Sequence, residues 1–171
     1  MMRAMPARSG RRELLLLRHA DAGDPMAWKR PDEERPLSDK GQKQADRLGR
    51  FLAGIGFAPD AVITSPKVRA AQTAEIVARH LGVPVATDDR LAVALDAGRL
   101  DALLRDAGDP SRPVIVGHDP DFSDLIAELC GTSSLLMRKG AFARVDIEHP
   151  LRPGTGALRW LVPPDLLKPG R

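Results

Sequence analysis

Short apolar segments alternate with amphipathic segments along this chain, and this alternation limits the folds that it can adopt. Residues 13–18, 61–64 and 113–117 are apolar runs of strand length, and a stretch with helical spacing follows each of them. Strands that alternate with helices are typical of α/β proteins with a largely parallel sheet. The sequence therefore predicts an α/β fold, a three-layer α/β/α sandwich with a mostly parallel central sheet.

Capping residues mark where the predicted helices begin. Ser38 is predicted to cap the first helix, and Ser65, followed by Pro66 at the first helical position, the second. Residues 99–107 form the third helix, and Asp119 is predicted to cap the fourth. The residues expected on the buried face of the first helix are Ala45, Leu48, Leu52 and Ile55. Further strands are predicted at residues 83–87, 141–147 and 157–162, the last two as a terminal pair.

Composition indicates an ordinary soluble protein. The chain has 171 residues, of which 43% are hydrophobic and 29% charged, and this suits one domain. No apolar run approaches the ~20 residues that a membrane span needs, so no membrane partner is expected. The single cysteine, Cys130, leaves no disulfide framework, and a reducing, cytoplasmic location follows. No cluster of metal ligands is evident, and we expect a monomer without a metal or other cofactor.

Basic residues concentrate at the start of the chain. Residues 1–12 contain four arginines and no acid, whereas the rest is close to neutral within a net charge of +3. We therefore predict a flexible basic arm at residues 1–12 and one domain at residues 13–171. Because aromatic residues make up only 4% of the chain, there is little to stack on bases, and no nucleic-acid partner is expected. An arm that docks on nucleic acid or anionic lipid is a minor alternative.

Polar residues follow three of the predicted strands at the point where each strand ends. The first strand runs into Arg18 and His19, the second into the segment with Arg69, and the third into His118. In a parallel sheet these ends meet at one edge, which is where ligands bind. Arginine and helix N-termini suit a phosphoryl group, and a neutral imidazole can attack phosphorus. The sequence therefore predicts a phosphate site at this edge.

Four segments of the sequence carry a family resemblance: residues 14–22, residues 32–38 with Gly41, residues 64–74 and residues 114–120. Together they resemble the histidine phosphatase superfamily, which has the phosphoglycerate mutase-like fold, and its small SixA-like branch in particular. The resemblance spans about residues 13–165. It implies that His19 is a nucleophile phosphorylated during turnover, with Arg18, Arg69 and His118 completing the catalytic and substrate-binding pocket. The SixA-like branch implies removal of phosphate from phosphohistidine on a protein such as a phosphorelay domain.

The family's acidic proton donor has no clear counterpart in this chain. Larger members carry it in an insertion between the second arginine and the second histidine, but the corresponding stretch, residues 88–98, is short. Asp89 and Asp96 lie in this stretch, and Asp21, two residues after His19, is retained as a possible proton donor. A phosphoramidate P–N bond breaks more readily than an ester bond and needs less help from an acid. The missing acid therefore fits a phosphohistidine substrate.

Two other functions stay open at this point. A phosphomonoesterase or mutase acting on a small phosphorylated metabolite would need an acid for its leaving group. A non-catalytic phosphate-binding module would need the arginines but not His19 as a nucleophile. Arg35 is predicted either to tie down its loop or to contact the substrate's phosphate, and we count it among the substrate-binding candidates.

Overall fold

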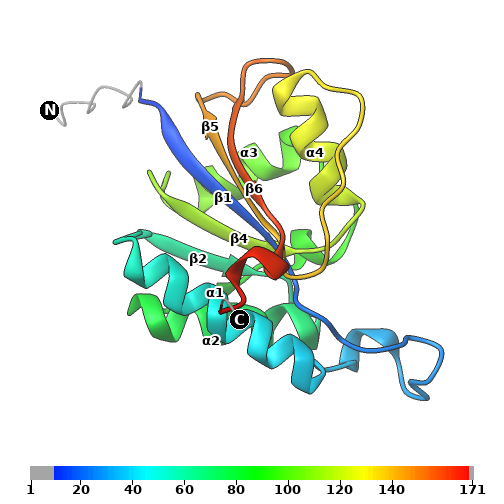
Figure 1. Ribbon diagram of the computed structural model, residues 1–171. Coiled ribbons are helices and arrows are strands. Elements are labelled where there is room, and N and C mark those ends of the chain that lie inside the picture. The colour runs from blue at the N-terminus through cyan, green and yellow to red at the C-terminus, as the bar shows by residue number, and fades with distance from the viewer. Residues whose placement is uncertain (1–9, 170–171) are drawn as a thin grey trace, which may run out of the picture.

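A six-stranded sheet forms the centre of the computed structural model, which describes residues 10–169. The strands are β1 (Arg12–Arg18), β2 (Ala61–Thr64), β3 (Val85–Thr87), β4 (Pro113–Gly117), β5 (Phe142–Ile147) and β6 (Ala157–Val162). The helices are α1 (Asp39–Gly54), α2 (Val68–Leu81), α3 (Ala97–Asp106) and α4 (Asp121–Cys130). Three 3-10 turns are η1 (Asp32–Glu34), η2 (Asp89–Ala92) and η3 (Pro164–Leu167). Helices α1 and α2 cover one face of the sheet, and α3 and α4 cover the other (Figure 1).

The strand order is β3-β2-β4-β1-β5-β6. The first four strands are parallel, β5 runs antiparallel to β1, and β6 runs antiparallel to β5. The predicted three-layer α/β/α sandwich with a mostly parallel sheet is therefore confirmed, as is the terminal pair. Among the described residues, no helix combines the length and the apolar character needed to cross a membrane.

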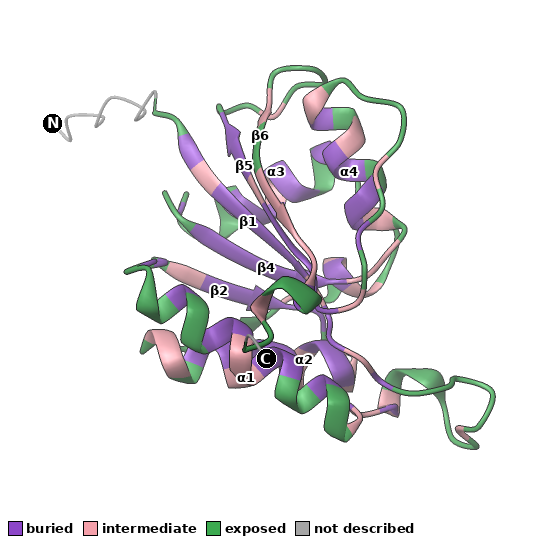
Figure 2. Cartoon of the chain, in the orientation of Figure 1, coloured by how far each residue is buried: buried purple, intermediate pink, exposed green. Residues whose placement is uncertain are grey.

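The leucine run of β1 is continuous because helices cover both faces of the sheet. Leu14 and Leu16 pack with the core on the side of α3 and α4, whereas Leu15 and Leu17 pack on the side of α1 and α2. All four side chains are fully buried, and Figure 2 shows the central strands as the most buried part of the molecule. A strand buried on both faces reads as an unbroken apolar run rather than an alternating one.

Two helices begin later than the sequence predicts. Helix α2 starts at Val68, its cap position is Lys67, and no side chain caps it, so Ser65 and Pro66 precede the helix. Helix α4 starts at Asp121, although the carboxylate of Asp119 still accepts the N–H of Ser123 at 3.1 Å. The cap predicted for the first helix is confirmed, since Ser38 Oγ accepts the Gly41 N–H at 3.1 Å.

The sequence predicts one buried residue too many at the end of the first helix. Ala45, Leu48 and Leu52 are buried, but Ile55 is 49% exposed. Helix α1 stops at Gly54, so Ile55 lies beyond its last turn and no longer follows the buried face.

The domain begins earlier than predicted, because part of the basic segment belongs to the sheet. Arg12 is the first residue of β1, is 7% exposed, and pairs with Asp109 at 2.9 Å. Arg11 lies 3.7 Å from the buried carboxylate of Asp146. The first strand therefore includes Arg12, one residue before the predicted boundary at residue 13, and residues 1–9 of the predicted arm lie outside the described residues.

Candidate active site

Backbone pairing brings the ends of three strands together. In the sheet Arg18 is paired with Gly117, and Thr64 with Val116. The register continues past the strands, since the N–H of His19 donates to Gly117 O at 2.9 Å and that of Ser65 to Val116 O at 3.0 Å. Three strands that lie far apart in the sequence thus deliver their polar residues to one edge of the sheet.

His19 is buried with one nitrogen committed to the backbone. The side chain is 5% exposed, and its Nδ1 lies 2.8 Å from the carbonyl oxygen of Ala20. A carbonyl can only accept, so Nδ1 carries the proton and Nε2 carries the lone pair. Burial above all, with the charges of Arg69 and Arg18 adding to it, lowers the pKa of His19 from 6.5 to about 4. The imidazole is therefore neutral at neutral pH.

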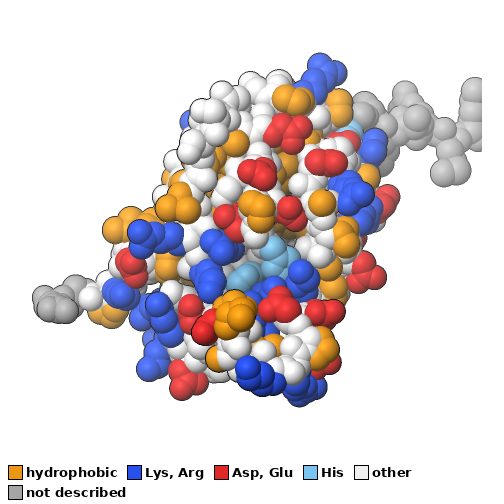
Figure 3. Space-filling view, turned by 90° about the vertical axis from the view of Figure 1, so that its right-hand side faces the viewer, with side chains coloured by type: hydrophobic (Ala, Val, Ile, Leu, Met, Phe, Trp, Pro, Cys, Tyr) orange, Lys and Arg blue, Asp and Glu red, His pale blue; other side chains and the backbone are white. Residues whose placement is uncertain are grey.

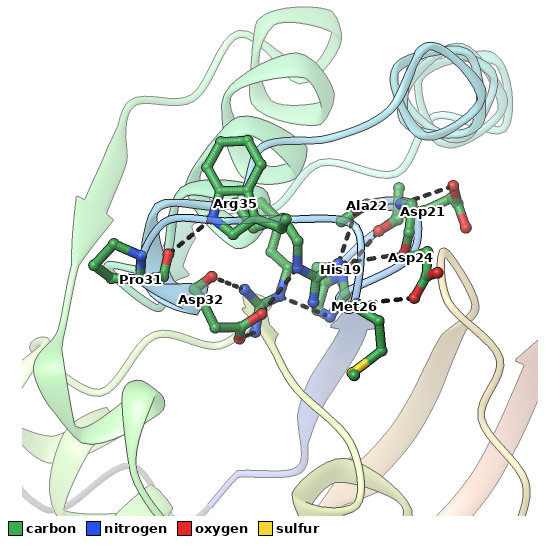
Figure 4. Close-up of polar contacts among 12 residues, drawn as sticks. His19, Asp21, Ala22, Asp24, Met26, Pro31, Asp32 and Arg35 are labelled. Carbon is green, nitrogen blue, oxygen red and sulfur yellow. Dashed lines mark hydrogen bonds and ion pairs between the residues drawn. The ribbon is translucent and has the colours of Figure 1, made fainter.

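Arg69 reaches His19 and is held from its far side by Asp32. Its Nε donates to His19 Nε2 at 3.3 Å, while Nη1 and Nη2 donate to the carbonyl and carboxylate of Asp32 at 2.7 and 2.9 Å. Asp32 is held in turn by Arg35, whose hydrogen bond, together with the charge of Arg69, keeps the pKa of the Asp32 carboxyl below its ordinary value. Figure 4 shows Asp32 directed toward the neighbourhood of His19. Asp32 therefore orients the guanidinium with its Nε edge toward the histidine.

Arg18 enters the same region from the end of β1. Its Nη1 donates to the carbonyl oxygen of Met137 and lies 3.8 Å from a carboxylate oxygen of Asp119. Its Nε is buried and has no hydrogen-bond partner among the described residues. A buried N–H without an acceptor is costly, so an entering oxyanion would gain a ready donor there.

His118 faces His19 across the site. The ring centroids are 5.3 Å apart, and His118 Nε2 lies 2.8 Å from the hydroxyl of Ser65. Burial, with the nearby His19, Lys67 and Arg69, lowers the pKa of His118 to about 3. Figure 3 shows histidine side chains at the centre of this face, with lysine and arginine side chains beside them. The arrangement offers a neutral nucleophile among several N–H donors.

Glycines allow the surrounding loops to approach closely. A Cβ at Gly41 would lie 1.9 Å from the carbonyl oxygen of Asp21, so no other residue fits between α1 and the loop that follows His19. Gly140, with φ at +77°, donates its N–H to the His19 carbonyl at 2.9 Å. Both glycines thus help to fix the backbone on either side of the histidine.

Residues 14–107 match a family model, that of the histidine phosphatase superfamily (branch 1). The chain belongs to the histidine phosphatase superfamily. The phosphohistidine phosphatase SixA of Escherichia coli strain K12 is 28% identical over 161 residues, which cover 91% of this chain and 96% of SixA. The 8-oxo-(d)GTP phosphatase of Mycolicibacterium smegmatis is 32% identical over 122 residues, which cover 68% of this chain and 37% of that protein.

The structural comparison agrees with the family assignment. A structure of the protein histidine phosphatase SixA complexed with tungstate is 26% identical and has a TM-score of 0.77, covering 91% of this chain and 99% of that one. This histidine phosphatase is therefore a SixA-like member of its superfamily, and its enzyme class is that of a phosphatase, a hydrolase. The family that the sequence resembles and the predicted enzyme class are both confirmed.

The structure brings Arg18, His19, Arg69 and His118 together as the sequence predicts. Arg35 lies outside this group. Its Nε donates to Asp32 and its Nη1 to the carbonyl oxygen of Ala22 at 2.8 Å, so it ties down the loop that carries Asp32. The loop-tying role of Arg35 is thus the one that the contacts support.

Asp21 points away from His19 (Figure 4). Its carboxylate accepts the hydroxyl of Ser38 at 2.6 Å and the N–H of Gly23 at 3.2 Å. Partial burial would raise the pKa of this carboxyl, but the hydrogen bonds from Ser38 and Gly23 outweigh it and hold the pKa below its ordinary value. These contacts do not support the predicted role of Asp21 as a proton donor, and Asp96 caps α3 instead.

Sequence reasoning missed the residues that hold the reactive side chains. Asp32 and Ser65 both lie within the segments that resemble the family, but their partners, Arg69 and His118, are far away in the sequence. The Met137 carbonyl that accepts from Arg18 leaves no sequence signal at all, because every residue has such a group. Within residues 10–169, no three His, Cys, Asp or Glu side chains gather as a metal-ligand set.

The two buried histidines make stability depend on pH. Their pKa values are about 4 and about 3 in the folded protein, against 6.5 ordinarily, so between pH 6.5 and 4 the unfolded chain binds protons that the folded protein does not. The free energy of unfolding should therefore fall as the pH drops from 7 to 5, on the order of 1–2 kcal/mol for each histidine. Urea unfolding at pH 7 and at pH 5, for the native protein and for the double variant His19→Asn/His118→Asn, measures this fall in the free energy of unfolding. An equal loss in both proteins would contradict this assignment.

Proposed function

We propose that this phosphatase removes phosphate from phosphohistidine on a protein, through a phosphorylated His19 intermediate. The lone pair on His19 Nε2 attacks phosphorus while the bond from phosphorus to the substrate's imidazole nitrogen breaks. The bonding electrons stay on that nitrogen, which takes a proton from solvent and leaves as neutral imidazole. Water then attacks the phosphorus on His19, which releases inorganic phosphate and restores the imidazole. The observation that carries this proposal is the neutral Nε2 of His19, which lies within reach of Arg69 and His118.

The surrounding donors suit the negative charge of the transferring group. In the structure the Nε–H of Arg69 occupies the lone pair of His19, and it would turn to a phosphoryl oxygen once a substrate enters. The unpartnered Nε–H of Arg18 supplies another donor. Phosphoryl transfer depends mainly on positioning and on stabilising charge at the equatorial oxygens, which such donors provide.

Three observations favour a phosphoramidate carried by a protein. Among the described residues, no carboxyl group hydrogen-bonds to His19 or His118, and a P–N bond makes the smaller demand on an acid. A groove of about 600 Å³ lies between η1 and the start of α2 and has room for part of a protein substrate; it is lined by Glu33, Glu34, Pro66, Lys67, Val68 and Ala92. The likeness to the phosphohistidine phosphatase SixA over nearly the whole chain supports the same substrate class.

A comparison of substrates tests this proposal. We expect kcat/KM to be highest on a phosphorelay domain phosphorylated at histidine, lower on free phosphoramidate, and lowest on an alkyl phosphate. The likeness to an 8-oxo-(d)GTP phosphatase makes a small phosphate ester the second candidate, so a nucleoside phosphate belongs in the same assay. Faster turnover of the alkyl or nucleoside phosphate than of the phosphoprotein would reject the phosphohistidine substrate.

A further inference from the structure

Ser65 is a fully buried serine whose hydroxyl contacts His118. It stands between β2 and α2, and Oγ lies 2.8 Å from His118 Nε2. The N–H of Lys67 donates to the same oxygen at 3.3 Å. This hydroxyl has no other hydrogen-bond partner among the described residues.

The hydrogen bonds of this serine determine where its own proton points. If His118 donated from Nε2, the oxygen would accept from both His118 and Lys67, and the serine hydrogen would be buried without an acceptor. If the serine donates to Nε2 instead, every group on Ser65 is satisfied. Each arrangement leaves one buried donor without an acceptor, the serine O–H in the first and the His118 Nδ1–H in the second, but the first also leaves the Nδ1 lone pair without a partner among the described residues. The second arrangement leaves fewer buried polar groups unsatisfied and is therefore favoured.

A serine that donates to Nε2 leaves the proton of a neutral imidazole on Nδ1. His118 Nδ1 is buried and has no partner among the described residues. Four charged or titratable groups act on this ring: His19, Lys67 and Arg69 favour its neutral form, and Asp32 opposes them. Nδ1 is then an N–H donor without an acceptor among the described residues, available to an anion that enters the site.

We propose that Ser65 is a positioning residue that holds His118 as the tautomer protonated on Nδ1, so that this histidine donates a hydrogen bond to the phosphoryl group. The inference rests on the proposed function for its catalytic meaning, but the tautomer itself is a property of the free protein. It assigns His118 the part of a neutral donor rather than a cation or a base. The attacking lone pair then belongs to His19 alone.

Nitrogen-15 NMR of the imidazole rings in the full chain tests the tautomer without any substrate. At pH 7 we expect native His118 to be protonated on Nδ1. Ser65→Ala should give a mixture that includes the Nε2-protonated form, and Ser65→Thr, which keeps a hydroxyl, should restore the native tautomer. Ser123→Ala is the matched control, because Ser123 is a buried serine that bonds to Asp119 and not to His118.

Kinetics provide the second measurement. By analogy with the loss of the hydrogen-bond partner that orients a metal-ligating histidine, we expect Ser65→Ala to lower kcat/KM on phosphohistidine roughly tenfold to a hundredfold, and Ser65→Thr to recover most of it. Native His118 protonated on Nε2, or an Ser65→Ala protein with unchanged tautomer and kcat/KM, would overturn the inference. Failure of the phosphohistidine assay alone would count against the proposed function and leave the tautomer measurement standing.

Discussion

Replacement of His19 by alanine is expected to lower kcat by a factor of roughly 10⁴ or more, as the loss of a catalytic nucleophile does in other enzymes. No neighbour can replace it. His118 is the one other imidazole at the site among the described residues, and its Nε2 is engaged by Ser65. Without His19 the donors around the site could still bind phosphate, but no nitrogen lone pair would face the phosphorus.

Trapping of the phosphoenzyme measures this effect directly. Native protein quenched during turnover should carry acid-labile, alkali-stable phosphate, and His19→Ala should carry none. His80→Ala is the matched control, because Arg79 and His80 repeat the dipeptide of Arg18 and His19 at the end of α2, where His80 bonds to Asp46 at 2.8 Å. Turnover by His19→Ala at the native rate would exclude the covalent mechanism.

Replacement of Arg69 by lysine is expected to lower kcat/KM by a factor of roughly 10²–10³, the usual effect of losing one preorganised donor to a transition-state oxyanion. The guanidinium spans from His19 to Asp32 with three of its nitrogens. A lysine ammonium is one point of charge and cannot donate along both edges at once. The positive charge would remain, but the donor aimed at the phosphoryl group would be lost.

Arg90→Lys is a suitable control for this measurement. Arg90 also bridges carboxylates, Asp88 and Asp106, at 2.7 Å each, but it stands apart from the histidines on the surface of the protein. Steady-state kinetics on phosphohistidine, with thermal unfolding of each variant, separate a catalytic effect from a loss of stability. An Arg69→Lys enzyme with native kcat/KM would show that charge alone suffices at this position.

Local patterns account for most of the agreement between the predicted and the observed structure. The leucine run of β1 and the spacing of Ala45, Leu48 and Leu52 predict correctly which side chains are buried, because the repeat of a strand or a helix can be recognised within a short stretch of sequence. The disagreements come from competing contacts. Serine is a common residue type at the start of a helix, but the hydroxyl of Ser65 bonds to His118, and α2 begins three residues later.

The layers of the fold, the family, and the meeting of Arg18, His19, Arg69 and His118 at one sheet edge could all be predicted from the sequence. The meeting of these residues could be predicted because parallel strands all end at the same edge, whatever the loops between them do. The groups that hold these side chains, and the hydrogen-bond partner of each histidine nitrogen, could be learned only from the folded structure. Those hydrogen bonds join residues 37, 53 and 119 positions apart, and their geometry depends on how the loops pack rather than on any local pattern.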